Sequence, residues 1–126
     1  MCNLACRGCN SMSSTRWAPI EKKLGWHAHQ PYKEKLTILD DVWNTVTHFK
    51  LIGGEPLMFK EHDEFIQRLS QRSDLDQVIL DYNTNGTFRP SQFVMDTWNK
   101  CRLVNIAVSI DGLNERNEFF RHGSQW

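Results

Sequence analysis

The alternation of apolar and polar residues along this chain predicts short strands separated by helices. Three runs are rich in strand-forming residues, and they cover His48 to Ile52, Gln77 to Tyr82 and Leu103 to Ile110. The last run is almost continuously apolar and lacks the alternation of a half-exposed strand. We therefore expect it to be covered on both faces, as strands of parallel sheets usually are.

Helices are predicted around these strands, where apolar residues recur every three or four positions. Asp40 is a candidate cap for a helix whose apolar residues are Val42, Trp43, Val46 and Phe49. Further helices are expected at Glu61 to Arg72, in a segment with Pro90 in its first turn, and at Leu113 to Arg121. Ser13 to Leu24 is expected to be helical or irregular, and Gly25 to Tyr32 to be a loop.

Strands that alternate with helices of this length are typical of βα crossovers, so the predicted fold class is α/β with a parallel sheet. No linker, low-complexity tract or charge run divides the chain. Its 126 residues are enough for one hydrophobic core and too few for two. We expect a single domain over residues 1–126.

Three of the four cysteines, Cys2, Cys6 and Cys9, lie within the first nine residues in a C-x3-C-x2-C spacing. Three cysteines cannot all pair as disulfides, so the spacing favours ligands of an inorganic centre. A 4Fe-4S cubane normally takes four cysteines, and three leave one iron open. Zinc is the alternative, since zinc sites also use clustered cysteines and a histidine such as His27 or His29. Cys101 is expected to be a small core residue.

A polar motif follows each predicted strand directly. The motifs are Gly53-Gly54-Glu55-Pro56, Thr84-Asn85-Gly86-Thr87 and Ser109-Ile110-Asp111-Gly112. In parallel sheets and barrels, the carboxyl ends of the strands carry the active site. Each motif alone is compatible with a simple turn, but together with the cysteine loop they predict one connected site. The chain has no G-x-G-x-x-G run, which excludes a Rossmann dinucleotide site at the paired glycines.

In this order the cysteine loop and the three motifs resemble the radical S-adenosylmethionine superfamily over essentially the whole chain. The loop begins Cys2-Asn3-Leu4, like the C-N-L-x-C run of that superfamily, and G-G-E-P, T-N-G and S-x-D-G follow. Residues 114–126 are similar to the corresponding segment of members with a C-terminal twitch or SPASM extension. Gly8 departs from the pattern, because members often carry an aromatic residue before the third cysteine.

The resemblance implies an enzyme in which Cys2, Cys6 and Cys9 hold a 4Fe-4S cluster and S-adenosylmethionine binds the open iron. An electron from the reduced cluster would then cleave the sulfonium to a 5′-deoxyadenosyl radical, which removes a hydrogen atom from the substrate. The resemblance also implies a small-molecule or peptide substrate, which the sequence does not distinguish. An electron donor such as flavodoxin or ferredoxin is the expected partner.

The same resemblance assigns cofactor-binding roles to residues at the strand ends. Gly53 and Gly54 would let backbone carbonyls approach the bound ammonium of S-adenosylmethionine. Glu55 would accept a hydrogen bond from that ammonium, and Pro56 would fix the turn. The remaining expected contacts, to the ribose, the methionine part and its carboxylate, come from Asn85, Ser109, Asp111 and Arg121.

The superfamily fold is a partial TIM-type barrel, of which this sequence supplies three predicted strands after the cysteine loop. Only Met1 precedes the loop, and the pattern is still running at Trp126. We therefore expect an incomplete, truncated barrel, a core fragment that alone binds cofactor poorly and does not turn over.

Charge and hydropathy limit the partners. Fifteen basic residues balance fifteen acidic ones, so no net field favours nucleic acid or an anionic membrane. No apolar run approaches the roughly 18 residues that span a bilayer, and no signal segment is visible. Clustered free cysteines favour a reducing compartment, so the cytoplasm is the expected location.

Overall fold

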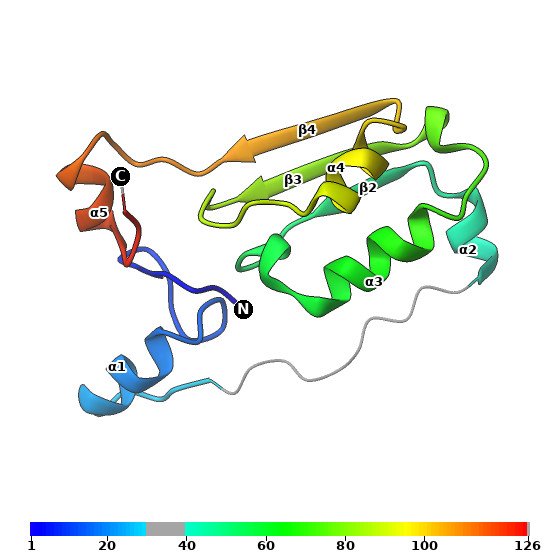
Figure 1. Ribbon diagram of the computed structural model, residues 1–126. Coiled ribbons are helices and arrows are strands. Elements are labelled where there is room, and N and C mark those ends of the chain that lie inside the picture. Colours follow the sequence, from blue (N-terminus) through cyan, green and yellow to red (C-terminus); the bar gives the residue numbers. More distant parts are fainter. Residues whose placement is uncertain (30–39, 126) are drawn as a thin grey trace.

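The structure is a computed structural model and describes residues 1–29 and 40–125. Strands and helices alternate along the chain (Figure 1). In order, and with η for 3-10 helices, they are β1 (Ala5–Cys6), α1 (Trp17–Lys23), α2 (Asp40–Thr45), β2 (His48–Leu51), η1 (Pro56–Met58), α3 (Lys60–Leu69), η2 (Leu75–Gln77), β3 (Ile79–Thr84), α4 (Gln92–Trp98), β4 (Leu103–Val108), α5 (Glu115–Phe120) and β5 (Arg121–His122).

The three predicted strands form one parallel sheet in the order β2-β3-β4. Phe49 of β2 lies opposite Leu80 of β3, which lies opposite Val104 of β4. The chain passes from β2 to β3 through α3 and from β3 to β4 through α4, so the crossovers are helical. The prediction of an α/β fold with a parallel sheet is therefore confirmed.

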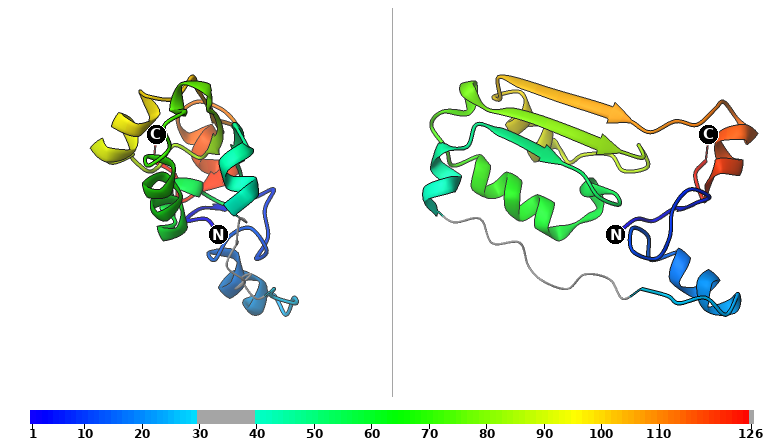
Figure 2. Two further views of the ribbon diagram at one scale, coloured as in Figure 1. Left: turned by 90° about the vertical axis from the view of Figure 1, so that its right-hand side faces the viewer. Right: turned by 180° about the vertical axis from the view of Figure 1, so that it is seen from behind.

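The apolar core lies between the sheet and one layer of helices. Helices α3 and α4 lie on the same side of the sheet (Figure 2). They bury Ile66, Leu69 and Val94 against Leu80 and Tyr82 of the central strand β3. Because β3 has neighbours on both edges and helices over one face, it is the most enclosed strand.

The prediction that Leu103 to Ile110 is covered on both faces is wrong. Most of β4 is exposed, and Ile106 and Val108 keep 47% and 50% of their accessible surface. The reason is that β4 forms an edge of this sheet and only Val104 packs against the core. Helix α5 lies beside the first residues of the chain instead of over β4 (Figure 1).

Helix boundaries also differ from the prediction. Pro90 lies before α4, and Ser91 is the N-cap whose hydroxyl accepts the Val94 N–H. The helix predicted after Asp40 ends at Thr45, so Phe49 belongs to β2. It still packs against Trp43, with 5.4 Å between ring centroids, because the chain turns directly from helix to strand. Of the loop predicted at Gly25 to Tyr32, the part beyond His29 lies outside the described residues.

A second, antiparallel pair joins the two ends of the chain, and the sequence pattern did not predict it. Ala5 lies opposite His122, and Cys6 lies opposite Arg121. Strands β1 and β5 thus bring α5 beside the cysteine loop (Figure 1). We call residues 40–108 the sheet half and residues 1–29 with 109–125 the loop half.

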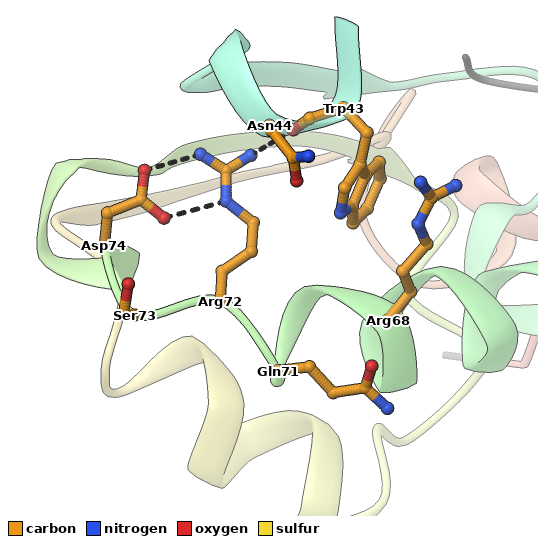
Figure 3. Close-up of a pocket in the computed structure, with 7 residues that line it drawn as sticks. All are labelled: Trp43, Asn44, Arg68, Gln71, Arg72, Ser73 and Asp74. Carbon is orange, nitrogen blue, oxygen red and sulfur yellow. Dashed lines mark hydrogen bonds and ion pairs between the residues drawn. The ribbon is translucent and has the colours of Figure 1, made fainter. Parts of the chain in front are cut away.

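A hollow of about 560 Å³ lies at the end of the sheet half where the strands begin (Figure 3). Arg72 is one of the residues that line it. Its guanidinium donates to the carbonyls of Trp43 and Val46, at 2.6 and 2.7 Å, and pairs with Asp74. The guanidinium of Arg68 lies 4.3 Å from the Trp43 ring centroid. These groups link α2 to α3, and this end of a parallel sheet usually serves stability.

Among the described residues, no helix is long and apolar enough to cross a membrane.

Candidate cofactor site

The cysteine loop is held in shape by side chains that follow it in sequence. Hydroxyls of Ser14 and Thr15 each donate to the Cys2 carbonyl at 3.2 Å, and Ser14 also contacts the Leu4 carbonyl. The indole of Trp17 donates to the Cys6 carbonyl at 2.8 Å. These bonds satisfy backbone carbonyls within and just before the two-residue strand β1.

The three cysteines are free thiols in two surroundings. Cys2 and Cys6 are buried, whereas Cys9 is exposed and its backbone N–H donates to the Cys6 carbonyl at 3.0 Å. Burial raises the pKa of the Cys6 thiol and the neighbouring Cys9 raises it further, while Arg121 lowers it. Within residues 1–29 and 40–125, no three Cys, His, Asp or Glu side chains converge as a single-ion metal site requires. A cubane differs, because its cysteines bind separate irons.

A hollow of about 480 Å³ opens beside Cys6 and Cys9. Its wall also includes Gly8, Asp111, Arg116, Phe120 and Arg121. A Cβ added at Gly8 would meet nothing within 4 Å, so the missing aromatic residue leaves open space there. Two arginines against one aspartate give the wall a net positive charge. A 4Fe-4S cluster bound by three thiolates is an anion. The thiols of Cys6 and Cys9 and the positive charge of this wall therefore fit such a cluster.

Arg121 and Asp111, two predicted cofactor contacts, lie against each other in this hollow. Arg121 Nε lies 2.8 Å from Asp111 Oδ2 as an ion pair, although the N–H does not have hydrogen-bond geometry. The Nη1 of Arg121 lies 4.0 Å from Cys6 Sγ. The pairing of β5 with β1 brings this guanidinium to the cysteine loop.

The Gly53-Gly54 turn is where the chain start touches the sheet half. The carbonyl of Met1 accepts the Glu55 N–H at 2.8 Å, and a Cβ on Gly54 would stand 1.9 Å from that carbonyl oxygen. Gly53 has φ +135°, which favours glycine. The close backbone approach expected here is thus present, and its partner in this structure is the residue before Cys2.

Glu55 lies at the centre of the strand-end motifs and is fully buried. Its Oε1 accepts the Thr84 hydroxyl at 2.7 Å and the Leu57 N–H at 3.2 Å, and its Oε2 accepts the Asn85 N–H at 2.6 Å. The carboxylate therefore joins the ends of β2 and β3. Pro56, also buried, begins η1 directly after it.

Asn85 reaches from the end of β3 to the cysteine loop. Its Nδ2 lies 3.3 Å from Cys2 Sγ and donates to Asn3 Oδ1 at 2.9 Å. Ser109 lies next to it across the sheet edge, where its backbone N–H donates to the Thr84 carbonyl at 2.8 Å. The predicted residues thus form two groups: Cys2 with Gly54, Glu55 and Asn85, and Cys6 and Cys9 with Asp111 and Arg121.

The contacts of several residues in this region were not predicted from the sequence. Arg116 lines the hollow, Trp17 and Thr15 hold the loop, and Asn3 and Thr87 contact Asn85. The T-N-G-T run could have pointed to Thr87, because short polar residues after a strand bond to one another. No sequence signal indicates Arg116. Cys101 packs against the core of the sheet half, as expected.

Comparison with known proteins agrees with this arrangement. A family described as 4Fe-4S single cluster domain matches residues 1–124. The chain belongs to this family. The match supports the 4Fe-4S cluster over the zinc ion that the cysteine spacing had left open.

The related proteins are enzymes. Chains named GTP 3′,8-cyclase from Campylobacter curvus and Thermodesulfovibrio yellowstonii are each 32% identical to this one, over 94% of it and 34% of their own length. A third, from Aquifex aeolicus, is 34% identical over 58% of this chain and 22% of its own length. The chain thus spans about a third of the length of the curated relatives it matches. No solved structure matches it.

These matches support the radical S-adenosylmethionine superfamily, and with it a 4Fe-4S cluster and S-adenosylmethionine as cofactors. They also support an enzyme, of which this chain corresponds to a part. The twitch or SPASM subgroup and the partial barrel stay predictions.

Proposed function

We propose that this chain is the cofactor-binding part of a radical S-adenosylmethionine enzyme. Cys2, Cys6 and Cys9 are the ligands of a 4Fe-4S cluster whose fourth iron takes S-adenosylmethionine. When bound, the pair of cofactors supplies reductive cleavage to a 5′-deoxyadenosyl radical, which removes a hydrogen atom from the substrate. The observation that carries the proposal is the cysteine loop itself, held between the carboxyl edge of the sheet and a wall with a positive charge.

The chain's own residues have distinct tasks in this proposal. Ser14, Thr15 and Trp17 hold the loop carbonyls, so that the thiols keep their positions before a cluster arrives. The ion pair of Asp111 and Arg121 is the contact for the methionine part and its carboxylate, since it lies in the hollow with Cys6 and Cys9. The turn of Gly53, Gly54, Glu55 and Pro56, with Asn85 and Ser109, completes the cofactor site.

Anaerobic reconstitution with iron and sulfide tests the ligands. We expect a brown protein with a broad visible absorption band, and loss of that band in Cys2→Ala, Cys6→Ala and Cys9→Ala. Cys101→Ala is the matched control, because this fourth cysteine packs in the sheet half and should leave the band unchanged. A colourless protein that retains one zinc ion per chain would instead identify the alternative, a non-catalytic zinc module.

Cofactor binding is tested on the reconstituted protein by equilibrium binding of S-adenosylmethionine. Arg121→Met should weaken binding at least tenfold, because it removes the cation expected to meet the carboxylate. Arg102→Met is the control, since Arg102 is exposed before β4. Release of 5′-deoxyadenosine under a strong reductant then reports cleavage of S-adenosylmethionine. If Arg121→Met and Arg102→Met bind S-adenosylmethionine equally well, Arg121 is not part of its binding site.

We further propose that the complete enzyme is a cytoplasmic, partial TIM-type barrel of the twitch or SPASM kind, reduced by a flavodoxin or ferredoxin. Its substrate is a small molecule or a peptide, and neither nucleic acid nor a membrane is a partner. The names of the relatives make GTP the first small molecule to test. Hydrogen transfer from substrate to 5′-deoxyadenosine, followed with deuterated candidates, distinguishes these substrates.

A further inference from the structure

We propose that Asn85 is a positioning residue for the cluster, whose side-chain N–H donates to the Cys2 sulfur and raises the cluster's reduction potential. This inference rests on the proposed function, because it requires Cys2 to be a cluster ligand. It gives Asn85 a task other than the ribose or methionine contact expected from the sequence. The distance of 3.3 Å from Asn85 Nδ2 to Cys2 Sγ carries it.

The orientation of the Asn85 amide follows from one backbone group. The N–H of Thr87 can only donate, and it lies 2.9 Å from Asn85 Oδ1. That atom must therefore be the carbonyl oxygen, which leaves the NH₂ group facing Cys2 and Asn3. The donor to the sulfur is thus fixed by the chemistry of the turn.

A closed ring of side chains keeps the amide in place. The Asn85 NH₂ donates to Asn3 Oδ1 at 2.9 Å, and the Asn3 NH₂ donates to Thr87 Oγ1 at 2.9 Å. The Thr87 hydroxyl then donates back to Asn85 Oδ1 at 2.6 Å. Within the ring, each of the two amides donates through one of its two N–H groups. The Asn85 NH₂ has its second N–H left for Cys2.

The backbone of Asn85 is anchored as firmly as its side chain. Its N–H donates to the buried Glu55 carboxylate at 2.6 Å, so the end of β3 cannot move away from the turn after β2. The donor is therefore preorganised for a sulfur that is itself buried. By comparison, Arg121 Nη1 is 4.0 Å from Cys6 Sγ, which makes Asn85 the stronger candidate.

The expected consequence is electrostatic. A hydrogen bond to a ligand sulfur stabilises the more negative, reduced cluster, so hydrogen bonds to the sulfurs set part of its potential. Without the donor, the reduction potential of the cluster is lower, so a one-electron reductant such as dithionite reduces a smaller fraction of it. The interaction acts on the cluster before any S-adenosylmethionine is bound.

The experiment is a redox titration of the reconstituted protein, without S-adenosylmethionine, followed by electron paramagnetic resonance of the reduced cluster. Asn85→Leu keeps the approximate volume and removes the donor. We expect about a tenfold lower ratio of reduced to oxidised cluster at a fixed potential, or about 59 mV for one electron. Asn85→Asp, which adds a negative charge, should shift the potential further in the same direction. Asn83→Ala, at an exposed position of β3 two residues before Asn85, is the matched control and should match the wild type.

A potential unchanged in Asn85→Leu would overturn the inference and leave the proposed function intact, whatever shift the added charge of Asn85→Asp causes. A wild type that takes up no cluster would instead reject the proposed function. If the Asn85 variants take up no cluster, Thr87→Val decides, because it keeps the Asn85 side chain but removes the hydroxyl that holds Asn85 Oδ1, so the NH₂ group points at Cys2 for less of the time. It should lower the potential by a smaller step, and an unchanged potential rejects the inference.

Discussion

The two halves of this molecule are held together by different forces. In the sheet half, buried side chains such as Ile66, Leu69 and Leu80 form one apolar core beneath two helices. In the loop half, the buried apolar cluster consists only of Cys2, Leu4 and Cys6. What shapes the loop half is a set of directed bonds from side chains to backbone carbonyls. The sheet half should therefore fold by itself, whereas the loop half depends on individual polar contacts and, in the proposed function, on a bound cluster.

The largest loss of stability is expected in the sheet half, from Ile66→Ala. Ile66 has no accessible surface and lies in the middle of the core, so the deletion should lower the free energy of unfolding by about 2–5 kcal/mol. Chemical denaturation followed by far-UV circular dichroism measures it. Ile52→Ala is the matched control, because Ile52 is 62% exposed and should change little. Equal losses at both positions would contradict the assignment of the core.

The next effect concerns the junction of the two halves. Gly54→Ala places a Cβ against the Met1 carbonyl, 1.9 Å away, so that the first residues must leave the turn. Overpacking of this kind costs about 1–3 kcal/mol. We expect faster amide exchange at Glu55, whose N–H bonds to that carbonyl. Gly8→Ala, assayed without iron, is the control because nothing lies within 4 Å of its Cβ. Unchanged exchange in Gly54→Ala would show that Met1 does not pack against this turn in solution.

The same division separates what the sequence could predict from what it could not. The β2, β3 and β4 strands were predicted because their hydrophobic patterns are local. The pairing of β1 with β5 was not, since each has two residues and their partners lie at opposite ends of the chain. The exposure of β4 was missed because coverage depends on where α5 packs, and periodicity carries no information about that.

The candidate site follows the same rule. The cysteine spacing and the positions of the motifs after the strands are local features, and parallel topology then brings the motifs to one edge. The partners of individual side chains are not local. Glu55 bonds to Thr84 and Asn85, and Asn85 reaches Cys2 across 83 positions of sequence. Only the folded arrangement shows that these side chains bond to one another.

A smaller effect is expected from Trp17→Phe in the loop half. The substitution removes the indole N–H and leaves the Cys6 carbonyl without that donor, which costs about 1 kcal/mol. Because the loop half has little apolar core, the loss should appear as faster amide exchange near Cys6 and Cys9, with β3 unchanged. Trp26→Phe is the control, since Trp26 is 61% exposed. Exchange that rises equally in both halves would mean that they unfold as one unit.

The smallest effect at neutral pH comes from His62, in the sheet half. Burial lowers the pKa of this histidine, whose Nε2 lies 3.0 Å from the Tyr82 hydroxyl, although Asp63 opposes the shift. The unfolded chain therefore binds a proton more readily than the folded one, and stability should fall as the pH drops below about 6.5. Denaturation midpoints from about pH 8 to about pH 5 measure this slope. His62→Gln should flatten it, because the substitution removes the group whose pKa is lowered by burial. If His62→Gln leaves the slope unchanged, the pH dependence in this range does not come from His62.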